Sequence, residues 1–205
     1  MSIPQKVKDY LDKQDIDYEE LAHKTVYTAY DAAQTLKKEL KQIAKNLLVQ
    51  ADKTFALVVV PADKKVDLNK IKKALGVKKV SIPNEKVMIK VLKIKPGAIS
   101  SFGKLHKLEL IVDKAMLGAK QAVFSTGSYT DSVLMKVKDY VQMEEAKLAD
   151  IAMKGGYKIP KSTKKKMQKV KKAVAKKKPV KKTAKKKVVK KTVKKTVKKK
   201  VSRRK

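Results

Sequence analysis

The sequence contains no cysteine and only two histidines, His23 and His106. The absence of cysteine excludes disulfides, thiolate nucleophiles and zinc or iron–sulfur sites built on thiolates. Two histidines far apart in the chain do not form the spacing of a histidine-rich metal site. We therefore expect neither a metal nor any other cofactor.

Long apolar runs and the usual enzyme fingerprints are also missing. The longest apolar run, residues 55–62, is far below the roughly 18 residues that span a bilayer. The first ten residues lack the apolar core of a signal peptide. We expect a soluble, cytoplasmic protein with no membrane partner. There is no Walker loop, no Gly-x-Ser-x-Gly, no His-Glu-x-x-His and no dinucleotide fingerprint.

Acidic residues are absent after Asp150. Residues 154–205 carry 27 Lys or Arg and no Asp or Glu, whereas residues 1–153 hold the other 27 basic residues and all 19 acidic ones. A segment with this much charge and few large apolar groups cannot offset its chain entropy by burying apolar surface. We therefore expect it to be disordered. The sequence predicts a domain over 1–153 and a tail over 154–205 that binds RNA or DNA phosphates without sequence choice. A solvated tail without a dedicated partner is the alternative.

The first 153 residues have the size of one domain and mix strand and helix signals. Thr28, Asp67 and Asn84 are expected to cap helices, and Gly76 to end one. Because strands and short helices alternate irregularly, with several joins like hairpins, we predict an α+β domain with a central strand at 55–60. Helices are expected over 4–14, 29–38, 68–75, 85–92 and 139–153. Strands are expected over 17–24, 42–50, 55–60, 79–82, 108–112, 122–125 and 133–137. The strands over 108–112 and 122–125 are expected to flank a turn.

Three features are candidates for chemistry. Lys45 interrupts an apolar strand, so its side chain faces either solvent or a polar cleft. The loop 97–103 places two glycines around small hydroxyl residues and a phenylalanine, which lets backbone N–H groups approach a ligand. The segment 127–131 lines a pocket or forms a plain turn. An ordinary connection remains the alternative for the loop, and Ser100 and Ser101 fit turn positions.

Several segments occur in an order that resembles a known family. Their order and spacing are similar to those of the YbaK and prolyl-tRNA synthetase-associated editing domains, and the resemblance covers about residues 15–145. It implies a compact mixed sheet, partly barrel-like and flanked by helices, and hydrolysis of the ester that joins a wrong amino acid to the tRNA 3′ end. The segments are Thr28–Ala33, Ala44–Val49, Phe55–Asp63, Asp67–Gly76, Pro96–Gly103 and Leu110–Asp113.

The resemblance also implies roles for residues. It places the family's strand lysine at Lys45 and its glycine loop at 97–103. Ser101 stands where the family usually has proline, and Leu92-Lys93 replaces a common Thr-Gly pair. We expect Ser101→Pro to be tolerated, because it restores the family's residue. Catalytic roles are implied for Lys45 and Gly97, substrate binding for His23, Ser100, Ser101, Phe102, Gly103 and Gly127, and a strand-end position for Asp113.

Two functions are consistent with these features. The first is an aminoacyl-tRNA deacylase that acts in trans on mischarged tRNA, with the aminoacylated 3′ end as its partner and a tail that adds RNA or DNA affinity. The second is a protein that compacts nucleic acid and carries a degenerate deacylase-like domain. In either case the tail suggests association with the nucleoid or the ribosome. The sequence predicts no oligomeric state.

Overall fold

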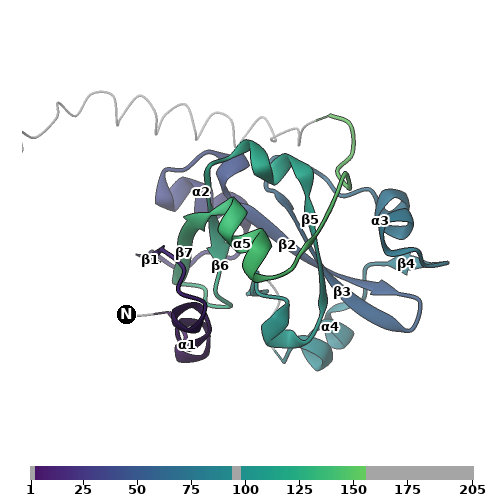
Figure 1. Ribbon diagram of the computed structural model, residues 1–205, viewed down its shortest axis with the longest axis horizontal. Helices are drawn as coiled ribbons and strands as arrows, with labels where there is room; N and C mark the ends of the chain where they lie inside the picture. Colours follow the sequence, from purple (N-terminus) through teal and green to yellow (C-terminus); the bar gives the residue numbers. More distant parts are fainter. Residues whose placement is uncertain (1–2, 94–97, 156–205) are drawn as a thin grey trace, which may run out of the picture. The chain divides into compact units, whose positions relative to one another are not determined.

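The computed structural model describes residues 3–93 and 98–155, which lie within one compact unit, Met1–Pro160. These residues form the predicted α+β fold, in which sheets are flanked by helices (Figure 1). The helices are α1 Gln5–Lys13, α2 Ala29–Leu36, α3 Leu68–Leu75, α4 Glu85–Leu92 and α5 Val137–Met143, with short 3-10 helices η1 Leu40–Gln42, η2 Lys104–His106 and η3 Lys114–Gly118. The strands are β1 Tyr18–Ala22, β2 Ala44–Ala51, β3 Thr54–Pro61, β4 Val80–Ser81, β5 Glu109–Asp113, β6 Gln121–Ser125, β7 Asp131–Lys136 and β8 Lys147–Ala149.

The strands form two sheets. One has the order β1-β7-β6 and is antiparallel throughout. The other has the order β4-β2-β3-β5-β8, in which β3–β5 and β5–β8 are parallel pairs and the β2 pairings are antiparallel. A bridge between Ile43 and Val123 joins the start of β2 to β6. The predicted central strand is confirmed, since β3 lies in the middle of the larger sheet.

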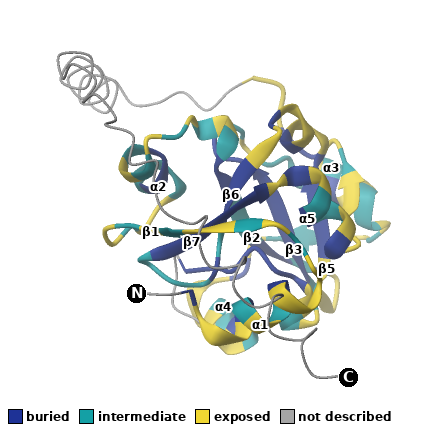
Figure 2. Cartoon of the chain, turned by 60° about the vertical axis from the view of Figure 1, so that its left-hand side comes forward, coloured by how far each residue is buried: buried dark blue, intermediate teal, exposed yellow. Residues whose placement is uncertain are grey.

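The larger sheet is buried on both faces, which explains the unbroken apolar run of β3. Leu57 and Val59 face the main core, which packs against α1, β6 and β7. Val58 and Val60 face a second cluster that includes Ile71 of α3. Strands β3, β5, β6 and β7 are mostly buried, while α1 and α4 expose much of their surface (Figure 2). Within the described residues, none of the helices combines the length and apolar character needed to cross a bilayer.

The predicted helix caps are confirmed. The Thr28 side chain accepts a hydrogen bond from the Asp31 N–H, and Asn84 accepts one from Val87 N–H at 3.0 Å. Asp67 accepts from two N–H groups in the first turn of α3. Gly76 ends α3 with a φ of 69°, a left-handed value that glycine adopts without steric cost.

The predicted closing helix over 139–153 is wrong. Helix α5 ends at Met143, and Glu145 has a φ of 51°, which turns the chain out of the helix. The chain then forms β8, which pairs with β5 and completes the sheet. Sheet hydrogen bonds outweigh the helix propensity of this segment, because propensity is a weak prior that tertiary contacts override.

The turn expected between the strands at 108–112 and 122–125 is also wrong. These strands, β5 and β6, belong to different sheets and are joined through η3. Their separation follows from pairing, because β5 lies between two parallel partners while β6 forms a hairpin with β7.

The last described residues run beside the segment that precedes α3. Asp67 N–H donates to the Ile151 carbonyl at 2.8 Å, and Met153 N–H donates to the Lys65 carbonyl at 2.8 Å. Val66 and Ala152 form a bridge between these bonds. The chain after β8 is therefore attached to the entrance of α3.

Candidate active site

A cavity of about 370 Å³ lies where the two sheets meet. Its walls come from the segment before α2 and from α2 itself, from the start of β2, from α4 and from the β6–β7 hairpin. Small apolar side chains supply much of the lining, and lysine, asparagine, serine, Thr28 and Glu85 supply the polar groups. These residues include Ala29, Ala32, Ala44, Lys45, Asn46, Ile99, Ser125, Ser128 and Ser132.

Lys45 lines this cavity and is half-buried. Its ammonium group donates a hydrogen bond to the backbone carbonyl of Lys64. Burial lowers the pKa of Lys45, and the nearby carboxylate of Asp63 opposes that effect. Among the described residues, Oδ1 of Asp63 is buried and has no hydrogen-bond partner. Lys45 is thus a half-buried cation whose ammonium group is held by the Lys64 carbonyl, not a lysine facing open solvent.

Asn46, the next residue, connects β2 to the loop after Gly97. Its amide donates to the Ile99 carbonyl at 2.7 Å, and its Oδ1 accepts from the Ser101 hydroxyl at 3.0 Å. Ser101 also accepts from Ser125 N–H at 3.0 Å and donates its own N–H to the Ser125 carbonyl at 2.8 Å. Ser101 is fully buried, so it fixes the loop to β2 and β6.

His23 and Ser132 form a hydrogen-bonded pair beside the cavity. The ring Nδ1 of His23 lies 2.9 Å from the Lys24 carbonyl, and Nε2 lies 2.9 Å from the Ser132 hydroxyl. Because a carbonyl only accepts, the neutral ring carries its proton on Nδ1 and accepts the Ser132 proton at Nε2. This pair positions a serine hydroxyl in the cavity wall.

Other predicted residues lie away from the cavity. Phe102 is completely buried, and its ring makes edge contacts with Tyr10 and Tyr140. A Cβ on Gly103 would lie 3.1 Å from the Leu108 carbonyl, so close packing requires glycine there. Gly97 falls outside the described residues. Phe102 and Gly103 therefore hold the loop in the core.

Ser100 and Gly127 lie together beside the cavity. Ser100 is buried, and its hydroxyl accepts from Phe102 N–H at 3.3 Å. Gly127 has a φ of 89°, and a Cβ there would contact Ser100 and the Ala98 carbonyl at 3.6 Å. Gly127 begins a polar turn in which Ser128 lines the cavity, so the segment 127–131 is both a turn and part of the wall.

Asp113 is a structural anchor. Its carboxylate accepts from Ala115, Ile151 and Ala152 N–H groups at 2.7–2.8 Å, and it is buried. These bonds hold the chain after β8 in place. In the described parts of the chain, no three His, Cys, Asp or Glu side chains gather as they would around a metal.

Among the polar residues of the cavity that sequence reasoning missed are Asn46, Ser125 and Ser132. Asn46 had a signal, since it is a second polar residue beside Lys45 in an apolar strand. Ser125 and Ser132 face each other across the β6–β7 hairpin, a pairing that depends on strand register. Neither strand alone indicates that its serine reaches a cavity.

Comparison with known proteins gives a consistent result. The family model for "Aminoacyl-tRNA editing domain" matches residues 23–143. A relative from Acetoanaerobium sticklandii, "Prolyl-tRNA editing protein ProX", is 28% identical over 152 residues, which cover 71% of this chain and 93% of the relative.

Solved structures share the fold. The "hypothetical protein APE2540" superposes with a TM-score of 0.67 at 22% identity, covering 72% of this chain and 99% of that one. A structure named "a putative trans-editing enzyme for prolyl tRNA synthetase" has a TM-score of 0.63 at 22% identity and covers 73% and 96% of the two chains. At these identities the likeness establishes the architecture alone.

Proposed function

The chain belongs to the family of aminoacyl-tRNA editing domains, which are hydrolases, and on this premise we propose that it removes a small, wrong amino acid from tRNA for proline. The tRNA specificity of this proposal is supported by the printed function of the relative from Acetoanaerobium sticklandii. The editing occurs in trans, on a tRNA already charged.

The cavity supports a small amino acid. Its volume of about 370 Å³ is near the lower end of the roughly 300–1,000 Å³ range of ligand pockets. The side chains of Ala29, Ala32 and Ala44 leave room for the aminoacyl group without deep apolar recesses. A bulky aromatic amino acid would compete with the ribose for the same space.

Ester hydrolysis requires the protein mainly to position the substrate and a water molecule and to stabilise the negative charge that develops. Water adds to the ester carbonyl, the carbon–oxygen bond to the ribose breaks, and the ribose oxygen takes a proton. The products are the free amino acid and the tRNA. We assign the Lys45 ammonium to the phosphate or ester region, where it stabilises developing negative charge. Backbone N–H groups of the loop that begins at Gly97 are the proposed oxyanion donors.

The observation that carries this proposal is the convergence of Lys45, Asn46 and paired serines on one cavity within the matched residues. The test is deacylation by the full chain of tRNA for proline carrying alanine, serine, cysteine or proline, with correctly charged tRNA for alanine as a comparison. We expect the fastest release for one small, mismatched amino acid. Background rates across the panel with a folded protein would contradict it and would favour the nucleic-acid-compacting alternative.

We also propose that the lysine-rich segment 154–205 adds general affinity for nucleic acid. Its support is the sequence alone, 27 basic residues with no acidic residue. Polycations release counterions from phosphate backbones without reading bases. The same charge would bring the protein to the ribosome or the nucleoid, whose accessible surfaces are rich in phosphate.

Deletion of residues 155–205 tests the tail directly. We expect the truncated protein to lose most of its affinity for random duplex RNA or DNA. The slope of log K against log salt should also decrease in magnitude by about 0.9 for each duplex phosphate that the protein no longer neutralises. A scrambled tail of equal composition is the control and should bind like the original. Equal affinity with and without the tail would refute the proposal without affecting the editing assignment.

A further inference from the structure

Tyr27 is an exposed aromatic side chain at the mouth of the cavity. It is 64% exposed, the highest value among the large apolar side chains of the described residues, and it also lines the cavity. Burial of such a ring is normally favourable. Its exposure at this place indicates a surface that receives part of a ligand.

A second aromatic ring supports Tyr27. Tyr129 lies in the turn that follows β6, and the two ring centroids are 5.2 Å apart with an interplanar angle of 55°. The rings come from segments about a hundred residues apart in the sequence. They meet because the segment before α2 runs beside the β6–β7 turn.

The backbones of both tyrosines are fixed. Val26 N–H donates to the Tyr129 carbonyl at 2.9 Å, and His23 N–H donates to the Thr130 carbonyl at 2.8 Å. After Tyr27, the Thr28 side chain caps α2. Fixed backbones on both sides limit where the rings can move, so the aromatic pair is organised before any ligand arrives.

We infer that Tyr27, supported by Tyr129, is the stacking platform for the base of the nucleotide that carries the amino acid. This inference rests on the proposed function, because the substrate ester joins the amino acid to the ribose of the terminal adenosine. With the aminoacyl group in the cavity, the base of that nucleotide lies within reach of the cavity mouth. Aromatic side chains bind unpaired bases by stacking, which requires no hydrogen-bond readout.

The position of the platform separates two tasks. The cavity selects the amino acid by size, whereas the aromatic pair holds the adenosine that every tRNA shares. Stacking at Tyr27 then contributes to affinity for any aminoacyl-tRNA without changing which amino acid is removed.

The test compares substrates with and without a base. The full chain is assayed on the mischarged tRNA and on an alkyl ester of the same amino acid, which lacks the nucleoside. For Tyr27→Ala we expect KM for the tRNA to rise by roughly 5- to 150-fold, the range of base stacking on aromatic residues. KM for the alkyl ester should change far less than KM for the tRNA, and Tyr27→Phe should restore KM for the tRNA.

A matched control removes exposed apolar surface elsewhere. Ile89 on α4 is 45% exposed and is not part of the cavity lining, so Ile89→Ala should leave both substrates unaffected. Equal losses of Tyr27→Ala on both substrates would overturn the platform, because a structural defect would explain them. An unchanged KM for tRNA would overturn it as well.

A binding measurement keeps the platform testable if no substrate is hydrolysed. An RNA hairpin ending in 2-aminopurine, with the amino acid attached through an amide, reports stacking by fluorescence quenching. We expect quenching with the full chain and with Tyr27→Phe, and its loss with Tyr27→Ala. Quenching that persists in Tyr27→Ala would refute the platform. Quenching of this probe by the wild-type chain, together with background rates on every mischarged tRNA of the panel, would instead refute the proposed function alone.

Discussion

The residues around the cavity and the residues around α3 differ in the balance of their charges. Residues 52–93, which we call the lysine segment, contain eleven lysines and four acidic residues. Residues 3–51 contain eight of each, and residues 98–153 contain seven of each. The net positive charge of the described domain therefore lies in the lysine segment, which includes α3, β4 and α4.

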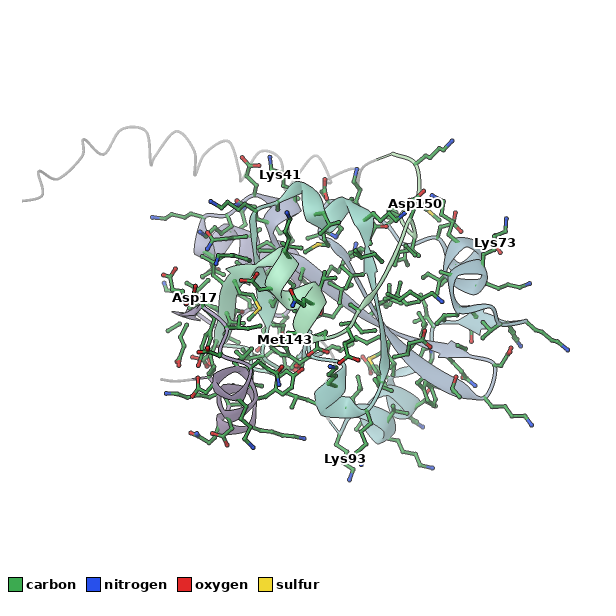
Figure 3. All side chains as sticks on the ribbon, viewed as in Figure 1. Asp17, Lys41, Lys73, Lys93, Met143 and Asp150 are labelled. Atoms are coloured by element: carbon green, nitrogen blue, oxygen red, sulfur yellow. The ribbon has the colours of Figure 1, made fainter. Side chains whose placement is uncertain are left out.

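The two regions also differ in how their polar groups are used. Around the cavity, Asn46, Ser101 and His23 are all hydrogen-bonded to defined partners. In the lysine segment most lysines point outward, as Figure 3 shows for Lys73 and Lys93. Hydrogen-bonded geometry is thus concentrated at the cavity, whereas the net positive charge, which would attract a polyanion at long range, is concentrated in the lysine segment, whose helix α4 also lines the cavity.

The largest effect is expected at Lys45. Lys45→Ala should lower kcat/KM for the mischarged tRNA by on the order of 10²-fold, the scale of removing one electrostatic interaction with the transition state. Thermal stability should change little, because the ammonium has one backbone partner. Lys41→Ala, an exposed neighbour paired with Glu39, is the control and should remain active. A large drop in Tm for Lys45→Ala would assign the residue to the structure.

A substitution at Ser101 tests the hydrogen-bonded side of the comparison. Ser101→Pro removes the N–H that donates to Ser125 and the hydroxyl that donates to Asn46. Because Ser101 is fully buried and its substitution leaves Asn46 and Ser125 without these hydrogen bonds, we expect a loss of about 1–3 kcal/mol in the free energy of unfolding. This reverses the tolerance expected from the sequence.

Urea unfolding of three proteins measures this loss. Ser101→Ala keeps the N–H and should be intermediate between the wild type and Ser101→Pro. If Ser101→Pro equals the wild type in stability, proline fits the loop and the original expectation stands.

The lysine segment should affect affinity more than chemistry. Lys72→Gln combined with Lys73→Gln removes two exposed charges of α3, which have no ion pair within the described part of the chain. For each phosphate that the variant no longer neutralises, the slope of log K against log salt should decrease by about 0.9 with duplex RNA or DNA. Turnover at saturating tRNA should be unchanged.

The matched control lies on the balanced side of the domain. Lys13→Gln combined with Lys37→Gln removes the same charge from two exposed positions at the ends of α1 and α2. Filter binding at several salt concentrations compares the two double variants. An equal change in slope for both would show that only total charge matters, and the regional comparison would fail.

The smallest effect concerns Glu144, a buried carboxyl group. It accepts from the Tyr10 hydroxyl at 2.8 Å and from Lys104 N–H at 3.0 Å. Burial raises its pKa above the ordinary value of 4.5, although these hydrogen bonds oppose the rise. The folded state therefore binds this proton more tightly than the unfolded state does. Its contribution to stability is present below pH 4.5 and is lost as the pH rises through the raised pKa.

Glu144→Gln should abolish that part of the pH dependence, which urea unfolding between pH 4 and 7 will show. Glu145→Gln is an instructive control, because the ion pair with Lys104 lowers the pKa of Glu145. For Glu145 the stabilisation is present above its unfolded pKa and is lost as the pH falls through the lowered one. The two neighbouring variants should therefore change the pH profile in opposite directions. Identical profiles would contradict the burial of Glu144.

Local signals in the sequence predicted much of the fold. Caps at Thr28, Asp67 and Asn84 are hydrogen bonds between residues two or three apart, so the sequence itself contains both partners. The prediction of a helix after α5 was wrong because the strand that forms there, β8, pairs with β5, which lies more than thirty residues earlier in the chain. Good helix formers at 144–149 gave no indication of that partner.

The candidate site was predictable only in part. Lys45 is a charge in an apolar strand, and this contrast is visible without a structure. The burial of Phe102 and Ser101 is not visible, because a loop rich in glycine and serine looks exposed. The proposed role of Tyr27 also depends on its contact with Tyr129, which only the pairing of distant segments creates.

The attachment of Ile151–Met153 to Lys65–Asp67 has a practical consequence for shortening the protein. Lys64, whose carbonyl holds the Lys45 ammonium, is the residue immediately before that attachment. A cut at residue 150 would release the backbone beside Lys64 and leave Lys45 without a firm acceptor. A cut after Met153 would keep it. We therefore expect the minimal editing unit to extend to residue 153, ten residues beyond the end of the family match, because Ile151–Met153 holds the segment beside Lys64 in place.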